Sequence, residues 1–385
     1  MKKKLVAMLL CAAMAFSLCA CGDDNKGNAN GTETEDTQST EEIKITEADL
    51  PKVEKVADYG DVNAILKEEY VVTEDEISQG FSSFMANHGL GLVEVKDRDT
   101  VQEGDIVKID YVGYQNGEAF EGGTAQEQWV DVSKNSSVDG ASGATLSSYI
   151  EGFTKGLLGA KVGETAKSEV TFPESYGNEE LAGKPATFDF TIHGIYQTVT
   201  EDTISDDVIA ENFKETYDIS TLAELMNHIK EELTYNAIME YLMNNSSFQI
   251  SDKYVEYRTN TFIEYQKEML RSMYGDSVDL DTYLSYMNGY TVEQILPTWK
   301  EMMESQIKYE ILCAKIAEQE NLSLDDESLK AEVLKKLSED AKEEDFESYY
   351  KYVGAGNIED GKNYLRNETV VKEFMLNNYN ATVTE

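Results

Sequence analysis

The chain has 385 residues and a formal net charge of -41, with 74 acidic residues against 33 Lys and Arg. This balance argues against nucleic acid as a partner, because phosphate binding requires an excess of Lys and Arg. The length allows two or three domains, and 41% hydrophobic residues are enough to give each of them a core.

The first twenty residues have the pattern of a targeting segment. MKKK is a basic start, and the apolar run from Leu5 to Leu18 is short for a membrane span. The sequence LCAC that ends at Cys21 resembles a bacterial lipobox, which implies cleavage before this cysteine and its lipidation. The alternative is an ordinary secretory peptide with incidental cysteines. We expect a lipoprotein signal peptide at residues 1–20 and an extracytoplasmic protein anchored to the membrane by lipid.

Two segments of different character follow. Residues 21–43 are polar and acidic without an aromatic residue, which predicts a disordered tether. Residues 44–100 are expected to form a short folded lead-in. Within it, Thr73 and Glu76 have the spacing of a capping box, and Gly89 is expected to end the amphipathic helix that begins there.

From Asp105 onwards the period of the pattern changes to two, which predicts strands. The hairpin signal Asn-Gly follows at residues 116–117, and a later run alternates through Ala186, Phe188, Phe190 and Ile192. Between the strands, apolar residues at i, i+3 and i+7 predict one short helix; they are Ile150, Phe153 and Leu157. A short helix against an antiparallel sheet makes residues 101–197 an α+β unit.

The pattern of residues 198–385 is helical to the end, so we expect an all-α domain. Ser251 is a candidate N-cap of one long helix and Gly275 its stop. Nine of the 13 methionines lie in this region, and most of them are expected to pack between helices. Cys313, in a helical pattern, is expected to be a buried structural thiol.

Familiar catalytic motifs are missing from the sequence. Residues 177–184 imitate a phosphate-binding loop, but five residues separate the glycines where that loop has four, and Pro185 replaces its Ser or Thr. The three histidines are scattered along the chain and do not form a metal-binding pattern; they are His88, His193 and His228.

Three blocks within residues 101–197 resemble, in family order, an FKBP-type prolyl isomerase domain in the version carried by trigger factor. They are GDIVKIDYVGYQNGEAFEGG, YIEGFTKGLLGAKVGE and FPESYGNEELAGKPATFDFTIHGI. Later segments, including ESQIKYEILCAKIAEQENLSLDDESLKAEVLKKL, are similar to the helical domain of trigger factor. The resemblance implies an antiparallel half-barrel sheet wrapped on a short helix, followed by an all-α chaperone-like domain.

Carried over motif by motif, the resemblance implies a pocket for a prolyl ring. Its residues are Tyr111, Phe120, Glu121, Ile150, Phe153, Tyr176 and Phe190. In this assignment three phenylalanines receive the ring, Tyr176 donates a hydrogen bond to a substrate carbonyl, and Tyr111 and Glu121 orient their neighbours. Each apolar residue, taken alone, is better explained as part of an ordinary core.

The implied chemistry is rotation about an X–Pro amide, over a barrier of about 18–20 kcal/mol. The twisted amide has less charge separation than the planar one, so a dry aromatic pocket favours it. No acid, base, metal or cofactor is required. One departure from the family is SKNSSVDGASGATLSS at residues 133–148, which is longer than the usual connection and leaves the rim uncertain. Trp129 and Tyr149 are candidates for that rim.

The expected function is that of a prolyl isomerase and foldase acting on unfolded or newly exported proline-containing polypeptides. The family's ribosome-binding domain has no counterpart beside the signal peptide, so the ribosome is not an expected partner. Two alternatives remain: a holdase or substrate-binding lipoprotein without catalysis, and a structural or adhesive lipoprotein that reuses the scaffold.

Overall fold

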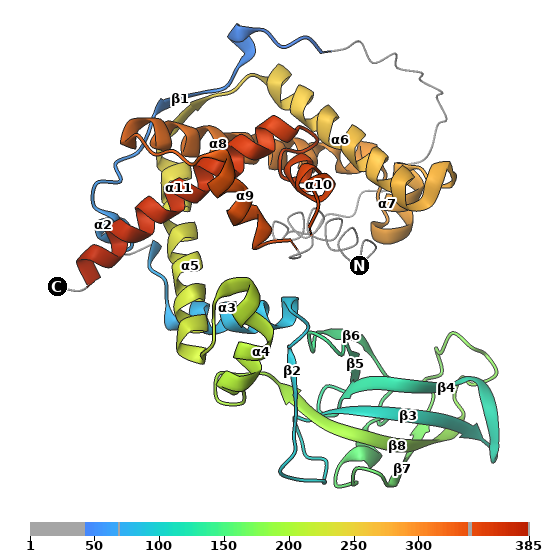
Figure 1. Cartoon of the computed structure of the whole chain (residues 1–385). Helices are drawn as coiled ribbons and strands as arrows, with labels where there is room; N and C mark the ends of the chain where they lie inside the picture. The colour runs from blue at the N-terminus through green and yellow to red at the C-terminus, as the bar shows by residue number, and fades with distance from the viewer. Residues whose placement is uncertain (1–42, 68–69, 338–340, 384–385) are drawn as a thin grey trace. The chain divides into compact units, whose positions relative to one another are not determined.

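The computed structural model describes residues 43–67, 70–337 and 341–383 (Figure 1). The predicted signal peptide, and all of the predicted tether but its last residue, lie outside the described residues. By packing, the chain divides into a sheet unit, Val72–Leu233, and a helical unit made of the described residues on either side of it. The predicted limits at residues 100 and 197 followed changes in sequence pattern, whereas this division follows contacts between elements.

The sheet unit is built on seven antiparallel strands. They are β2 (Leu92–Glu94), β3 (Ile106–Gln115), β4 (Glu118–Asp131), β5 (Ser136–Val138), β6 (Thr145–Ser148), β7 (Thr165–Thr171) and β8 (Pro185–Thr198). The order across the sheet is β2-β8-β3-β4-β5-β6, and β7 pairs with the first half of β8. The curled sheet and the helical region confirm the predicted fold class: an α+β half-barrel followed by helices.

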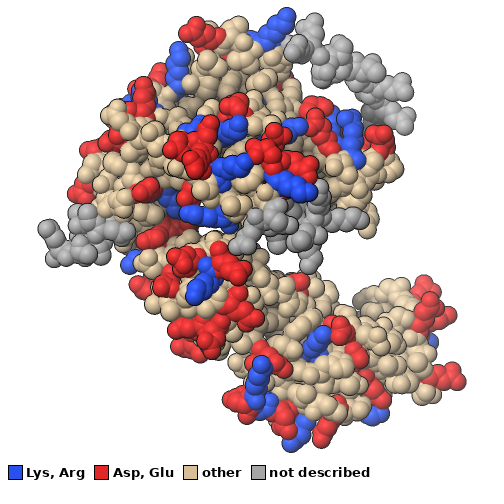
Figure 2. Space-filling view, in the orientation of Figure 1, with Lys and Arg blue, Asp and Glu red and all other residues tan. Residues whose placement is uncertain are grey.

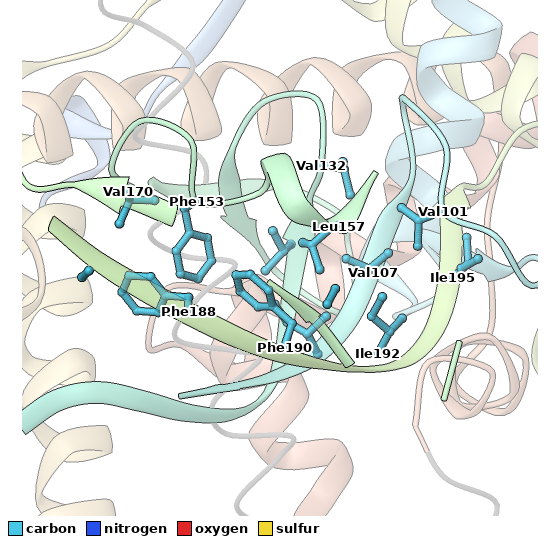
Figure 3. Close-up of a cluster of buried hydrophobic side chains, with 14 of the residues drawn as sticks. Val101, Val107, Val132, Phe153, Leu157, Val170, Phe188, Phe190, Ile192 and Ile195 are labelled. Carbon is cyan, nitrogen blue, oxygen red and sulfur yellow. The ribbon is translucent and has the colours of Figure 1, made fainter. Parts of the chain in front are cut away.

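Alternation of side chains places the core of this unit on one face of the sheet. Val107 and Ile109 on β3 are fully buried, as are Phe190 and Ile192 on β8 (Figure 3). Burying a side chain of this size contributes about 1.5–3 kcal/mol relative to leaving it exposed. The period-two prediction for these strands is therefore confirmed.

The helix predicted through Ile150, Phe153 and Leu157 is wrong. The segment consists of turns and a single 3-10 turn, η3 (Lys155–Leu157). Gly152 has a φ of 83°, outside the helical region. Gly156 lies so close to β7 that a Cβ atom there would approach the Lys167 carbonyl oxygen to 1.7 Å. The three apolar side chains still face the core, because turns bring them to the same side.

The lead-in helix is present and belongs to the sheet unit. It is α3 (Glu74–Asn87), and the predicted capping box at its start is confirmed: the Thr73 N–H donates to Glu76 Oε2 at 2.7 Å. Gly89, with a φ of 74°, follows its end as predicted. The buried face of α3 packs against α4 (Asp206–Tyr217) and the first part of α5 (Leu222–Asn245).

The helical unit contains the rest of α5 and seven further helices among the described residues. They are α2 (Val62–Ile65), α6 (Asp252–Tyr274), α7 (Leu280–Asn288), α8 (Val292–Glu320), α9 (Asp326–Leu334), α10 (Glu343–Val353) and α11 (Ile358–Val383). Short 3-10 turns lie at η1 (Glu47–Asp49) and η4 (Gly275–Ser277). Ser251 caps α6 by accepting the N–H of Tyr254, and Gly275 ends it, so both predictions are confirmed. Within the described part of the chain, every helix is too short or too polar to cross a membrane.

The prediction that residues 198–385 are all helical is wrong in one place. Strand β9 (Ser247–Gln249), between α5 and α6, pairs with β1 (Lys52–Lys55). Residues from the lead-in thus join the helical unit, where Val62 and Ile65 of α2 share a core with α5, α8 and α11.

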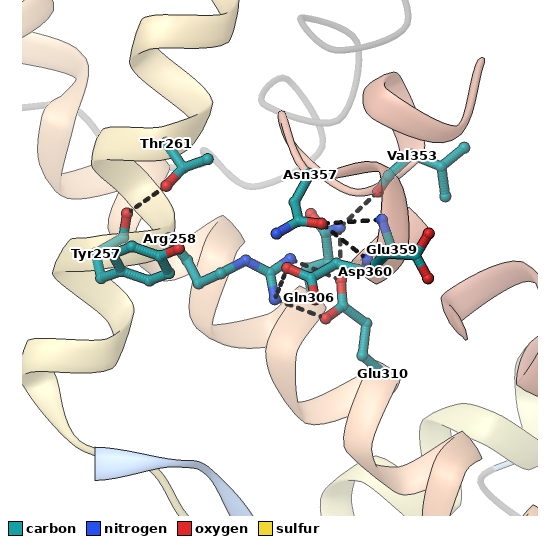
Figure 4. A network of polar contacts seen from close by, with 9 residues as sticks. All are labelled: Tyr257, Arg258, Thr261, Gln306, Glu310, Val353, Asn357, Glu359 and Asp360. Carbon is teal, nitrogen blue, oxygen red and sulfur yellow. Dashed lines mark hydrogen bonds and ion pairs between the residues drawn. The ribbon is translucent and has the colours of Figure 1, made fainter. Parts of the chain in front are cut away.

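The helical unit buries a thiol and an ion pair. Cys313 on α8 is fully buried, and burial raises the pKa of its thiol to about 12, so it is the inert structural thiol predicted. Arg258 on α6 is 2% exposed and makes a bidentate ion pair with Glu310 on α8, with N–O distances of 2.9 and 3.0 Å (Figure 4). Gln306 completes the group by donating to Glu310 Oε1 at 2.8 Å.

Most other charged side chains lie on the surface, although Asp105 and Asp131 of the sheet unit are buried. On the face shown in Figure 2, Asp and Glu side chains are widely spread with Lys and Arg interspersed among them. This distribution agrees with the formal net charge of -41.

Candidate functional site

The predicted pocket residues come from five separate parts of the sheet unit. Tyr111 lies on β3, Phe120 and Glu121 on β4, and Phe190 on β8. Ile150 and Phe153 lie in the turns between β6 and β7, and Tyr176 lies on the turn between β7 and β8. The antiparallel register sets Tyr111 directly opposite Phe190, on the core side of the sheet.

Phe153 is the centre of an aromatic cluster. Its ring is stacked on that of Tyr149, with centroids 4.1 Å apart and planes inclined by 16°. Edge contacts join it to Tyr111 at 5.1 Å, Phe188 at 4.9 Å and Phe190 at 5.1 Å. Figure 3 shows the rings of Phe153, Phe188 and Phe190 gathered on the same side of the sheet. The structure therefore brings together Tyr111, Phe153 and Phe190, as the sequence predicted.

Phe188 is a member of the cluster that the predicted site omits. It contacts Phe120 at 5.8 Å and Phe153 at 4.9 Å, so it joins the two halves of the cluster. Phe190 is completely buried beneath them. Alternation along β8 places Phe188 and Phe190 on the same face of the sheet. Their surroundings differ because of the register with β3: Phe188 lies opposite Gly113, whereas Phe190 lies opposite Tyr111.

Gly113 leaves the space that these rings occupy. A Cβ atom at this position would lie 2.6 Å from the Phe120 ring and 2.7 Å from the Phe188 ring. Carbon atoms that are not bonded to each other do not approach this closely, so a side chain there would displace one of the rings. The contact between Phe120 and Phe188 thus depends on the missing side chain at position 113.

Tyr176 lies at the exposed edge of the cluster. Its ring contacts Phe172 at 4.6 Å, and Phe172 in turn contacts Phe120 at 5.9 Å. The side chain is 39% exposed, so its phenol is within reach of a molecule that approaches from solvent. The Tyr176 N–H donates to the Pro173 carbonyl at 3.0 Å, which fixes the turn that carries it.

The phenols of the cluster are held in their neutral form. Burial, and secondarily the neighbouring Tyr176, raises the pKa of Tyr111. Burial, with a smaller effect of Tyr111, raises the pKa of Tyr149 to about 12. A phenol with a raised pKa stays protonated at neutral pH and remains a hydrogen-bond donor.

The remaining predicted residues lie at the margin of the cluster. Ile150 is half-buried and packs against the core. Glu121 is exposed on β4, next to Phe120. Of the two rim candidates, Tyr149 lies in the cluster, but Trp129 does not.

The placement of Trp129 at the rim is wrong. It pairs with Lys108, whose side chain points away from the core, and its ring contacts Tyr196 at 4.5 Å. A Cβ atom on Gly140 would lie 2.3 Å from the Trp129 indole nitrogen, so the insert runs directly over this ring. Trp129 therefore packs on the outer face of the sheet, against the insert.

The insert at residues 133–148 forms the hairpin of β5 and β6. Asp139 orders its tip by accepting the N–H of Ser142 at 2.7 Å. The tip is held against the start of β2, where the Gly91 N–H donates to the Ala141 carbonyl at 2.8 Å. These contacts place the tip over the outer face, on the side of the sheet opposite to the aromatic cluster.

Two protein families match successive segments of the chain. Residues 97–193 match the family described as FKBP-type peptidyl-prolyl cis-trans isomerase, and residues 210–373 match the bacterial trigger factor C-terminus. The first match contains the whole aromatic cluster. The second covers most of the described helices that follow the sheet.

Comparisons of the whole chain with known proteins also find trigger factors. The trigger factor of Shouchella clausii is 29% identical over 76% of this chain and 64% of its own length. That of Alkaliphilus oremlandii is 31% identical over 77% of this chain and 65% of its own length. The chain thus spans less than two thirds of these relatives. A solved structure from work on promiscuous substrate recognition by the trigger factor chaperone is 17% identical, with a TM-score of 0.28 over 88% of this chain and 79% of the other.

Proposed function

We propose that this homologue of trigger factor, which joins an FKBP-type peptidyl-prolyl cis-trans isomerase domain to a trigger factor C-terminal domain, catalyses isomerisation of X–Pro bonds in unfolded polypeptides. The observation that carries the proposal is the aromatic cluster around Phe153, with Tyr176 at its exposed edge. Apolar rings are assembled there beside a polar group that substrate can reach.

The proposed mechanism needs only these side chains. The rings of Phe120, Phe153 and Phe188 form an apolar surface for the prolyl ring, while Phe190 supports them from beneath. Water is excluded, so the twisted amide with its smaller charge separation is favoured over the planar one. Tyr176 donates a hydrogen bond to a substrate carbonyl and keeps the chain in register with the rings. Tyr111 and Glu121 are proposed to orient neighbours.

The test is catalysis by the purified protein. Wild type is expected to accelerate cis–trans exchange of an Ala–Pro tetrapeptide, and Tyr176→Phe to lower kcat/KM about tenfold, because one hydrogen bond to substrate is lost. Tyr114→Phe is the matched control: it removes a phenol hydroxyl from β3 on the opposite face of the sheet and is expected to change nothing. No rate gain from wild type at high protein concentration would contradict the proposal.

Binding of unfolded chains without catalysis is the second candidate. Its support is an exposed group of tyrosines and one methionine at and around α7, where Tyr286 is 88% exposed, Tyr290 53% and Met287 54%. Met and Tyr make adaptable contact surfaces. Three other methionines of this unit are buried, as expected of core residues; they are Met239, Met303 and Met375. Suppression of aggregation by a protein that fails the exchange assay would support this holdase.

We further propose that lipid on Cys21 anchors the protein to the outer side of the cell membrane. Its clients would then be newly exported polypeptides. The support is the lipobox-like sequence that ends at this residue. In a bacterial host, wild type is expected to incorporate labelled palmitate and to partition into detergent, whereas Cys21→Ser should do neither. Cys19→Ser, two residues earlier in the same motif, is the control that should still be lipidated. Label retained by Cys21→Ser would refute the anchor. That neither the ribosome nor nucleic acid is a partner stays a prediction.

A further inference from the structure

We propose that β6, the outermost strand of the insert hairpin, pairs with the backbone of an extended, uncharged segment of a client chain and leads its prolyl residue to the aromatic cluster. The proposal rests on the proposed isomerase function for the role of the cluster. It assigns a use to β6, whose four residues are all exposed and contribute nothing to the core.

The edges of the sheet differ in how they are protected. Strand β4, which pairs with β5 only at Val130 and Asp131, carries three glutamates along the rest of its edge. An edge strand exposes backbone N–H and C=O groups to pairing, and proteins usually place charges there to prevent it. The β7 edge carries Lys167 and Glu169, and β2 has three residues and ends with Glu94. Strand β6 reads Thr-Leu-Ser-Ser, has no charge, and is exposed at every residue, with Leu146 at 66%. Among the described edges of this sheet, β6 is the one without a charged residue.

The backbone of β6 presents hydrogen-bonding groups outwards. The Tyr149 N–H donates to the Asn135 carbonyl at 2.9 Å, and the register continues with Ser148 opposite Ser136 and Ser147 opposite Ser137. In an antiparallel pair these groups alternate between facing the partner and facing away. Since those of Tyr149 and Ser147 face β5, the N–H and C=O of Ser148 face the open edge.

The open edge is fixed to the aromatic cluster by Asn135. Its side-chain nitrogen donates to the carbonyls of Tyr149 at 3.0 Å and Ile150 at 2.9 Å, and its side-chain oxygen accepts the Thr154 N–H at 3.0 Å. These bonds hold both sides of the turn that carries Phe153. Ser148 directly precedes Tyr149 in the chain, and the Tyr149 ring is stacked on that of Phe153 with centroids 4.1 Å apart. A client strand paired at Ser148 advances about 3.3 Å per residue, so a proline two or three residues along reaches the cluster.

The features of β6 also define the client. Pairing through the backbone is independent of side-chain identity, and the uncharged strand with exposed Leu146 fits a segment of small, apolar or β-branched residues. Four residues allow only a short ladder. Such a ladder binds weakly and releases its client quickly, as an enzyme with many substrates requires.

The experiment compares two fluorescent dodecapeptides with one Ala–Pro bond each and otherwise Thr, Val and Ser. The second is N-methylated at alternate residues next to the proline, which removes the N–H groups that a ladder needs. Wild type is expected to bind the parent peptide about tenfold more tightly, the effect of one or two backbone hydrogen bonds. Ser148→Pro should abolish the difference, because proline is tolerated on an edge strand where its nitrogen faces solvent. Ser148→Ala keeps the N–H and should keep the difference.

The outcomes separate this proposal from the isomerase proposal. Equal binding of both peptides by wild type, a comparison that needs no variant to fold, overturns docking on β6. A difference that persists in Ser148→Pro overturns it as well. If the peptides bind equally and wild type forms a dimer that Ser148→Pro does not form, β6 pairs with a second copy of the chain instead. Exchange of an Ala–Pro tetrapeptide by wild type, a substrate too short for a ladder, tests the isomerase function alone.

Discussion

Phe153→Ala is expected to lower kcat/KM for an Ala–Pro tetrapeptide about a hundredfold, which corresponds to about 2.7 kcal/mol of lost transition-state stabilisation. Phe153 touches the rings of Tyr111, Tyr149 and Phe188, and its side chain is 2% exposed. Truncation would remove the ring at the centre of the cluster and admit water to the surface where the prolyl ring is proposed to lie. The measurement is prolyl exchange followed by NMR or a coupled assay.

Loss of stability must be separated from loss of catalysis. Truncation of a buried phenylalanine costs about 3–5 kcal/mol, and truncation of a buried leucine about 2–5 kcal/mol. Leu157→Ala is therefore the matched control: Leu157 is fully buried in the same core and only four positions away, but it is not part of the ring cluster. Compared at equal folded fraction, Leu157→Ala should retain activity. An equal loss in both variants would assign the effect to folding.

Arg258→Met is expected to lower the free energy of unfolding of the helical unit by about 3–5 kcal/mol, because it leaves Glu310 charged and without its main partner in a poorly hydrated site. The Arg258 side chain is 2% exposed and that of Glu310 13%. The double variant Arg258→Met/Glu310→Met removes both charges and should recover most of the loss, so the two effects should be strongly non-additive. Denaturant titration of the full chain measures both. Additive losses would contradict a coupled pair.

The same variant has a defined dependence on pH. Burial raises the pKa of Asp360, while the nearby Arg258 lowers it; their closest N–O distance is 3.9 Å. Without Arg258 the pKa of Asp360 should rise further. A carboxyl whose pKa is raised in the folded state takes up its proton more readily when folded, so stability is gained as the pH falls through that pKa. The deficit of Arg258→Met should accordingly shrink on acidification.

Strands could be predicted from the sequence because burial of one face leaves a period of two. The same rule could not choose between Phe188 and Phe190, which share a face; only the pairing with β3 shows that Phe188 lies over Gly113. It also could not locate Trp129, because an aromatic residue on the outer face of a strand has no pattern of its own until the covering insert is known. The helix predicted at 150–157 failed because close packing of Gly156 against the Lys167 carbonyl is a tertiary constraint.

Contacts between distant segments escaped prediction for the same reason. Strand β9 has three residues, and its partner β1 lies almost two hundred residues earlier in the chain, so no local pattern reveals the pair. The helix α3 was predicted with its capping box, but not its packing against α4 and α5. Local signals fix where an element begins and ends, whereas the choice among its apolar partners is made by the whole fold.

Gly113 has a consequence for how this domain can vary. The rings of Phe120 and Phe188 meet over the bare backbone of β3, at a position where even one methyl carbon would lie 2.6 Å from a ring. An alanine there would push the two rings apart and so reshape the apolar surface proposed for the prolyl ring. Because a glycine codon is one nucleotide away from an alanine codon, a single mutation would be enough to make this change.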